Sequence, residues 1–222
     1  MACTRIKICG LTREADVDAA VEAGADALGF VLWPGSARAV AAERAAALVG
    51  RLPPFVTPVL LFENAALAEI HRATALMPQA LLQFHGDETA AQCQAARRPY
   101  LRAARMAPGF DLLNFAAQFR GDSASGGAAG AMALLLDAHV DGYGGAGKVF
   151  DWSLLPQGVP LPLVLSGGLN PANVSDGIAR VRPWAVDVSS GVEASKGVKD
   201  AELMRHFCQA VRQADDRLSL AA

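Results

Sequence analysis

The chain has 222 residues, a length that fits one domain of ordinary size or two very small ones. Its 20 Lys and Arg residues nearly balance its 22 Asp and Glu residues, and a formal net charge of −2 argues against nucleic acid or a membrane surface as a partner. Hydrophobic residues make up 52% of the chain and charged residues 19%, a composition that excludes a disordered protein.

Short apolar runs alternate with longer amphipathic segments along the whole chain. Most of these runs are almost continuously apolar, which is typical of parallel strands covered on both faces. The pattern predicts eight strands, at residues 5–9, 27–32, 56–62, 81–84, 101–105, 132–137, 161–165 and 185–188.

Helices are predicted between these strands. The first is expected to have Thr12 as its N-cap and to end at Gly24, and the second is expected to end at Gly50. The expected helical segments are residues 14–23, 41–49, 65–75, 88–96, 111–119, a short turn at 153–155, 172–181 and 199–214.

About eight strand–helix units fit either a closed barrel or an open doubly wound sheet. A length of 222 residues is short for a barrel, which typically needs about 250. An open sheet usually carries a glycine-rich turn after its first strand, but here the glycine-rich turns follow the last three strands. The sequence therefore predicts an α/β protein with one domain, an eight-stranded parallel (β/α)8 TIM barrel over residues 1–222.

The four cysteines, Cys3, Cys9, Cys93 and Cys208, are scattered and form no metal-type Cys-x-x-Cys pair. Scattered cysteines in a chain of this length indicate reduced thiols in the cytoplasm. The first residues lack the basic and apolar segments of a secretory signal, and no apolar run reaches the roughly 18 residues of a membrane-spanning helix. We therefore expect a soluble cytoplasmic monomer or homodimer that binds no nucleic acid and no membrane.

Barrels carry their catalytic groups where strands end, and three residues of this chain follow that rule. Cys9 ends the first strand, where it is either a thiolate base or a buried structural cysteine. Asp137 ends the sixth strand, where its carboxyl either donates a proton, binds a cation or caps the next loop. His85 follows the fourth strand and either contacts a ligand or caps the next helix. No His or carboxylate pair has metal-ligand spacing, so no metal is expected.

Anion-binding features follow the second strand and the last three strands. Arg38 lies in the loop after the second strand, where it either pairs with a carboxylate or phosphate or is solvated at the surface. Glycine-rich turns let backbone N–H groups approach a phosphate, and Asn170-Pro171 has the pattern of an N-cap and first helical residue. The residues expected at a phosphate are Gly145, Gly147, Gly167, Gly168, Ser189, Ser190 and Gly191.

A set of short segments spans nearly the whole chain: Lys7-Ile8-Cys9-Gly10-Leu11-Thr12, Gly29-Phe30-Val31, Ser36-Ala37-Arg38, Gln83-Phe84-His85-Gly86, Leu136-Asp137, Gly144-Gly145-Ala146-Gly147-Lys148-Val149-Phe150-Asp151-Trp152, Ser166-Gly167-Gly168-Leu169, Asp187-Val188-Ser189-Ser190-Gly191-Val192-Glu193 and Gly197-Val198-Lys199-Asp200. In these segments the chain resembles the phosphoribosylanthranilate isomerase family of tryptophan biosynthesis. It departs from the family's usual residues at Ala37, Phe84, Ala146 and Lys196, and Ala146 removes a hydroxyl from one phosphate turn.

The resemblance implies an Amadori rearrangement of N-(5-phosphoribosyl)anthranilate to 1-(2-carboxyphenylamino)-1-deoxyribulose 5-phosphate. It assigns Cys9 as the general base and Asp137 as the general acid. Arg38 is then expected to hold the anthranilate carboxylate, and the glycine-rich turns the phosphate. The implied partner is the small phosphorylated substrate, and no metal or redox cofactor is needed.

Two alternatives stay open. The isomerase of histidine biosynthesis performs the same rearrangement on an aminoimidazole carboxamide substrate, but that family resembles a two-aspartate design, and Cys9 argues against it. A non-catalytic phosphate-binding barrel would bind sugar phosphates without turnover, which the presence of both Cys9 and Asp137 disfavours.

Strand alternation makes one prediction about the barrel interior. Lys7 shares a face with Cys9, and a buried ammonium needs a carboxylate nearby. Closing the barrel pairs the first strand with the eighth, in which Asp187 faces inward if Val186 and Val188 face the helices. We therefore predict a Lys7–Asp187 ion pair, whose positive charge favours the Cys9 thiolate.

Overall fold

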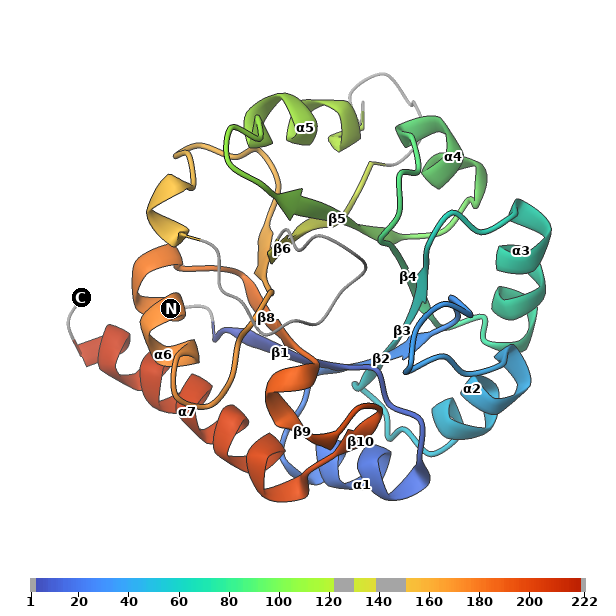
Figure 1. Ribbon diagram of the computed structural model, residues 1–222, viewed down its shortest axis with the longest axis horizontal. Helices are drawn as coiled ribbons and strands as arrows, with labels where there is room; N and C mark the ends of the chain where they lie inside the picture. The colour runs from blue at the N-terminus through green and yellow to red at the C-terminus, as the bar shows by residue number, and fades with distance from the viewer. Residues whose placement is uncertain (1–2, 122–129, 139–150, 221–222) are drawn as a thin grey trace.

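The computed structural model describes residues 3–121, 130–138 and 151–220, and in them eight parallel strands close into one barrel (Figure 1). Each strand pairs with its neighbour in chain order, and β1 pairs with β8 to complete the ring. The predicted barrel and all eight strands are confirmed, with ends that differ by at most two residues. The strands are β1 Arg5–Cys9, β2 Ala27–Val31, β3 Thr57–Phe62, β4 Leu81–Phe84, β5 Tyr100–Met106, β6 Ala133–Ala138, β7 Leu163–Leu165 and β8 Ala185–Val188.

Helices surround the barrel, and the last one, α7, lies along α1 and α6 where the ring closes (Figure 1). This helix extends six residues beyond its predicted end, and within the extension Leu218 packs, partly buried, against the core. Two short strands, β9 Glu193–Ser195 and β10 Val198–Lys199, form a hairpin that the sequence did not predict. The helices are α1 Glu14–Glu22, α2 Ala42–Val49, α3 Leu67–Leu76, α4 Ala90–Ala95, α5 Leu112–Phe119, α6 Val174–Val181, α7 Ala201–Leu220 and the short 3-10 turns η1 Trp152–Leu154 and η2 Ser190–Val192.

Some helix ends differ from the prediction. Gly24 has the positive φ of 89° expected after a helix, but Gly50 has an ordinary φ of −60°. Thr12 is not the N-cap of α1, because that position is Arg13. The Thr12 hydroxyl instead donates to the carbonyl of Gly197, 2.8 Å away, and so ties the β1–α1 loop to the hairpin.

The Asn170-Pro171 pair opens a turn and not the regular helix. Asn170 Oδ1 accepts a hydrogen bond from the backbone N–H of Ala172 at 2.8 Å, as a capping side chain does. The helix α6 begins only at Val174, after Asn173. The loop after β7 therefore reaches the helix through one extra turn.

Two layers of apolar side chains fix the position of the site. The outer layer fills the space between strands and helices, and the inner layer fills the barrel with Val59, Leu101, Ala103, Ala133, Leu135, Val164 and Ala185. Since side chains alternate along a strand, residues two positions further along also point inward. The inward residues at the carboxyl ends of the strands therefore form the mouth of the barrel.

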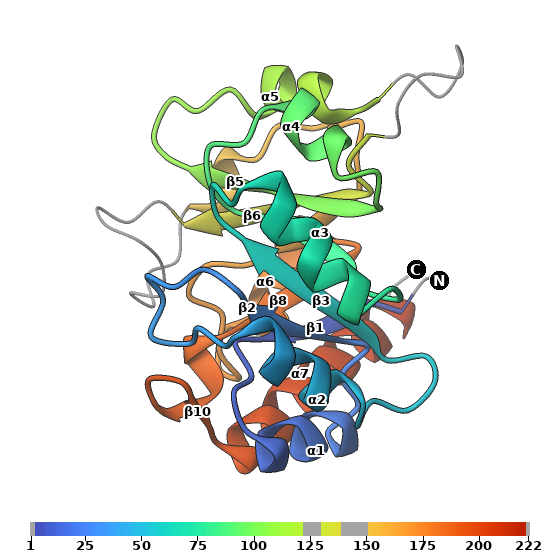
Figure 2. The ribbon, with the colours of Figure 1, turned by 90° about the vertical axis from the view of Figure 1, so that its right-hand side faces the viewer.

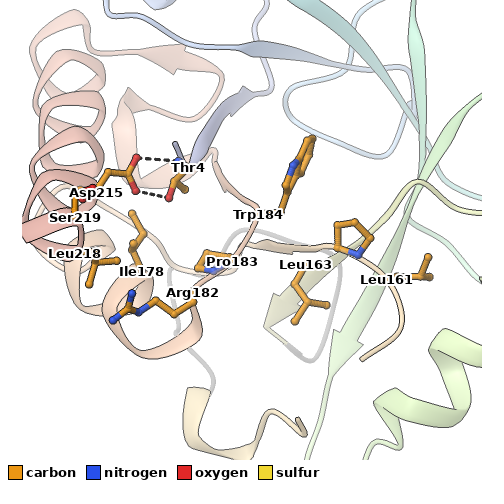
Figure 3. A pocket seen from close by; sticks show the side chains of 11 residues that line it. Thr4, Leu161, Leu163, Ile178, Arg182, Pro183, Trp184, Asp215, Leu218 and Ser219 are labelled. Atoms are coloured by element: carbon orange, nitrogen blue, oxygen red, sulfur yellow. Dashed lines mark hydrogen bonds between the residues drawn. The ribbon is translucent and has the colours of Figure 1, made fainter. Parts of the chain in front are cut away.

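The two chain ends lie on the face opposite to the β9–β10 hairpin (Figure 2). On that amino-terminal face, a groove of about 440 Å³ is lined by apolar side chains such as Leu163, Trp184 and Leu218 (Figure 3). Its carboxylate, Asp215, is already bound by the backbone N–H and the hydroxyl of Thr4, at 2.8 and 2.6 Å. This groove therefore offers little catalytic chemistry. Within the described ranges, no helix is both long and apolar enough to cross a membrane.

Candidate active site

Cys9 lies at the carboxyl end of β1 and points toward the mouth of the barrel. It packs against Val31 and Leu61, and Leu61 shares its strand face with Val59 of the inner layer. The Cys9 side chain is nearly covered by these neighbours and by Trp33. The position therefore fits both expectations at once: the thiol is buried, and it faces the end of the barrel where substrates bind.

Lys7 and Asp187 form the predicted ion pair one layer below Cys9. They are register partners across the β1–β8 seam, and Lys7 Nζ lies 2.7 Å from Asp187 Oδ1. Ser166 Oγ donates to the other carboxylate oxygen at 3.3 Å. Burial lowers the pKa of Lys7, but the interactions of Lys7 with Asp187 and Cys9 together outweigh burial, and the net pKa is raised. The ammonium therefore stays charged inside the barrel.

The effect of Lys7 on Cys9 is weaker than predicted. Burial raises the pKa of the Cys9 thiol, and the Lys7 charge lowers it only in part. The sign of the Lys7 contribution is as expected, but the net pKa of Cys9 lies above its ordinary value. In the ligand-free protein Cys9 is therefore mainly a neutral thiol at neutral pH.

Asp137 lies near the carboxyl end of β6, on the face that Ala133 and Leu135 turn into the barrel. Its Oδ2 lies 3.1 Å from His85 Nε2, and Gln83 Nε2 lies 3.0 Å from His85 Nδ1. Gln83 and Asp137 thus contact opposite ring nitrogens of His85 and fix the orientation of its imidazole. His85 is not the cap of α4, because Thr89 occupies that position. Its partner is Asp137.

Arg38 is not solvated, and its guanidinium already holds a carboxylate of this chain. Its Nε and Nη2 donate to Oε1 and Oε2 of Glu193, at 2.7 and 2.8 Å. Glu193 also accepts from Lys199 Nζ at 2.8 Å. Sequence reasoning missed Glu193 and Lys199 as functional residues, although the resemblance to the family included both.

The glycine-rich loops after β7 and β8 meet at the mouth. Gly167 and Gly168 have positive φ values of 74° and 71°. A Cβ atom at Gly191 would lie 1.9 Å from the carbonyl oxygen of Leu169, so that only glycine allows the two loops to touch. Ser190 begins the turn η2. These loops can present backbone N–H groups to one anion.

Two of the predicted phosphate residues, Gly145 and Gly147, lie outside the described residues. Ser189, which is also predicted to contact phosphate, accepts a hydrogen bond from Lys199 Nζ through its carbonyl at 3.0 Å. Its hydroxyl lies 3.4 Å from the same ammonium.

An ion pair that sequence reasoning missed lies near the carboxyl ends of β3 and β5. Arg105 Nη2 lies 3.3 Å from Glu63 Oε1 and donates to the carbonyl of His85 at 3.0 Å. Burial raises the pKa of Glu63, and Arg105 offsets part of this effect. The sequence placed Arg105 at the end of the fifth predicted strand and Glu63 directly after the third, but it assigned a role to neither residue. Among residues 3–121, 130–138 and 151–220, no three His, Cys, Asp or Glu side chains are grouped so as to hold a metal ion.

Comparison with known proteins gives consistent results. A family model described as N-(5'-phosphoribosyl)anthranilate (PRA) isomerase matches residues 6–210 of this chain. The N-(5'-phosphoribosyl)anthranilate isomerase of Methylibium petroleiphilum is 68% identical over 216 residues, which cover 97% of each chain.

Solved structures show the same similarity. Phosphoribosyl anthranilate isomerase from Thermotoga maritima superposes with a TM-score of 0.84 at 38% identity, over 95% of this chain and 99% of that chain. A structure of such an enzyme in complex with reduced 1-(o-carboxyphenylamino)-1-deoxyribulose 5-phosphate gives a TM-score of 0.79 at 35% identity, with the same coverage.

Proposed function

The chain belongs to the N-(5'-phosphoribosyl)anthranilate isomerase family, and we propose that Cys9 and Asp137 are the general base and general acid of its reaction. The substrate is N-(5'-phosphoribosyl)anthranilate, and the product is 1-(2-carboxyphenylamino)-1-deoxyribulose 5-phosphate. One observation carries the assignment: both residues lie at or next to the carboxyl ends of strands of the same barrel, β1 and β6, and on the inward faces of these strands.

The reaction is a sequence of proton transfers. Asp137 donates a proton to the furanose ring oxygen, the bond from that oxygen to C1' breaks, and an open-chain iminium forms. The positive iminium acidifies the neighbouring C2'–H, and the Cys9 thiolate removes this proton to give an enolamine. Loss of the enol proton and protonation at C1' then give the ketone. No electron leaves the substrate, so the chemistry needs no redox cofactor.

His85 holds the acid in place in this proposal. Its Nε2 contacts Asp137 Oδ2, and Gln83 fixes the orientation of the imidazole from the other side. The side chains of Asp137 and His85 are each about one-fifth exposed, at 21% and 19%. Asp137 can therefore recover a proton from solvent between turnovers.

The two ends of the substrate are bound by different groups. Arg38 binds the anthranilate carboxylate, because a guanidinium matches a carboxylate with two parallel hydrogen bonds. The backbone near Gly168, Ser190 and Gly191 binds the phosphate. This support comes from the contact between the two loops and from their place at the carboxyl ends of β7 and β8.

Loss of substrate fluorescence tests this function. Freshly generated phosphoribosylanthranilate should lose its fluorescence when the protein is added. The corresponding aminoimidazole carboxamide substrate of histidine biosynthesis serves as the comparison. Turnover of that substrate alone would indicate that the protein is instead the isomerase of histidine biosynthesis. Tight binding of sugar phosphate without turnover of either compound would indicate a non-catalytic barrel.

A further inference from the structure

Glu193 and Lys199 form a buried charged group beside Arg38, outside the eight strands of the barrel. The two residues are register partners in the β9–β10 hairpin, which places their side chains next to each other. The side chain of Lys199 is completely buried and that of Glu193 is 5% exposed. Glu193 already binds Arg38, the residue proposed to bind the substrate carboxylate. The two carboxylates would compete for the same guanidinium, so the presence of Glu193 needs an explanation.

The hydrogen bonds show how this competition is avoided. Glu193 uses both oxygens on one edge of the guanidinium, the edge formed by Nε and Nη2. An arginine has five N–H donors on a rigid plane, so a second edge, formed by Nη1 and Nη2, is left over. Within the described part of the chain, Nη1 of Arg38 has no hydrogen-bond partner. One guanidinium can therefore hold Glu193 and a ligand carboxylate together.

The charges of this group also favour the binding of a second carboxylate by Arg38. Arg38 and Lys199 carry two positive charges against the single negative charge of Glu193, so the group keeps one positive charge. Burial raises the pKa of Glu193, but hydrogen bonds from Arg38 and Lys199 outweigh it, and the net pKa is lowered. Glu193 is therefore ionised at neutral pH, and Lys199 neutralises it. The charge of Arg38 is left for another anion.

Arg38 lies next to the residue that follows the catalytic thiol. Gly10 comes directly after Cys9 and has a φ of 82°, and a Cβ atom built on it would lie 2.5 Å from Cδ of Arg38. The aliphatic part of Arg38 therefore crosses the backbone at Gly10. Only 12% of the Arg38 side chain is exposed, so its free edge has few directions in which to point.

We propose that Glu193 is a positioning residue for Arg38. It holds the Nε/Nη2 edge so that the Nη1/Nη2 edge receives the carboxylate of the substrate, and Lys199 keeps the Arg38 charge available by neutralising Glu193. This inference rests on the proposed function, because it assumes that the substrate carries an anthranilate carboxylate.

If Glu193 had only a structural role, that role would be to attach the β9–β10 hairpin to the barrel. The hairpin has other anchors for that purpose: Thr12 donates to the carbonyl of Gly197 at 2.8 Å, and the backbone N–H of Lys199 donates to Asp16 at 3.2 Å. A neutral residue of the same shape at position 193 should therefore leave the fold intact.

The variant Glu193→Gln tests the proposal with two ligands. One is reduced 1-(o-carboxyphenylamino)-1-deoxyribulose 5-phosphate, and the other is the same compound without its ring carboxyl group. We expect affinity for the first to fall about tenfold to a hundredfold, the range of an oriented hydrogen bond between charged groups. Affinity for the second should change less than about twofold. The control Glu14→Gln removes an exposed carboxylate that contacts Arg44, and it should change neither affinity.

A double variant separates positioning from a general effect. In an Arg38→Met background, Glu193→Gln should cause no further loss of affinity for the carboxylate ligand, because its action passes through Arg38. Two results would overturn the proposal. One is an equal loss of affinity for both ligands in Glu193→Gln, and the other is a loss of affinity from Glu193→Gln that is as large in the Arg38→Met background as in the wild-type protein. If Glu193→Gln does not fold, Glu193→Asp replaces it, with the same comparison of ligands and the same criterion. Failure of the wild-type protein to convert phosphoribosylanthranilate would instead contradict the proposed function.

Discussion

Lys7 and Asp187 form an ion pair in the interior of the barrel, with Nζ of the lysine 2.7 Å from Oδ1 of the aspartate. Both side chains are buried, so each charge has lost most of its hydration. Their mutual attraction offsets this loss only while both are present. The pair joins β1 to β8, directly below Cys9.

Removing one member of this pair should destabilise the protein. Lys7→Met or Asp187→Asn leaves the other charged group buried without its ionic partner, which typically costs about 3–5 kcal/mol. The midpoint of denaturant unfolding measures this loss. The double variant Lys7→Met/Asp187→Leu should regain much of the stability, since no buried charge is left. A double variant less stable than either single one would contradict this account.

The catalytic assignment predicts large losses of turnover without loss of fold. Cys9→Ala and Asp137→Asn should each lower kcat at least about a hundredfold, because a general acid or base typically contributes that much. Circular dichroism should show both variants folded. Cys3→Ser is the matched control, since Cys3 is the exposed cysteine, and it should keep wild-type kcat. Near wild-type kcat in Cys9→Ala or Asp137→Asn would remove that residue from the mechanism.

The pKa of Cys9 predicts how activity depends on pH. Burial raises this pKa above its ordinary value, so the thiolate fraction is small at neutral pH and grows as pH rises. We expect kcat/KM to increase from neutral into alkaline pH. Ultraviolet absorbance of the thiolate, taken as wild type minus Cys9→Ala, gives the pKa directly. Lys7→Met should raise it further, because a nearby positive charge is lost. A Cys9 that titrates below its ordinary value would contradict this prediction.

Arg38 should affect binding more than chemistry. Arg38→Met removes the group proposed to bind the anthranilate carboxylate and should raise KM with a smaller change in kcat. Arg38→Lys keeps the charge but loses the forked geometry, so it should not restore KM. Steady-state kinetics checks both. Unchanged KM and kcat in Arg38→Met would exclude Arg38 from the substrate site.

The phosphate site can be found in crystals grown with phosphate or sulfate. The anion should contact backbone nitrogens near Gly168 and at Ser190 or Gly191, because the loops after β7 and β8 meet there. Gly191→Ala would push its new Cβ against the carbonyl of Leu169 and should weaken product binding. An anion seen only in the groove beside Trp184, at the opposite end of the barrel, would contradict this assignment.

Regular geometry made much of the fold and the interior predictable. Alternation along β1 and β8 placed Lys7 and Asp187 face to face, because inward and outward positions follow a period of two residues. The same rule placed Cys9 and Asp137 toward the mouth. Burial of Cys9 was also foreseeable, but the balance between burial and the Lys7 charge depends on how closely Val31 and Leu61 cover the thiol.

Contacts between loops were not predictable in the same way. Glu193 meets Arg38 only because a short hairpin after β8 folds toward the loop after β2, 155 residues earlier in the chain. No periodic pattern connects these two segments. Asn170 has the local pattern of a helix cap, but one extra turn separates it from α6, since Asn173 takes the position before the helix.

The seam between β1 and β8 also has a consequence for the order of assembly. Lys7 and Asp187 are 180 residues apart, and Thr4 binds Asp215 still nearer the end of the chain. During synthesis the first strand therefore gains its second neighbour only after β8, Ala185–Val188, has been made. Contacts between such distant segments slow folding, and an unpaired strand edge is open to wrong partners meanwhile. Cys9 lies on that first strand, so a chain without β8 does not assemble the mouth of the barrel around it.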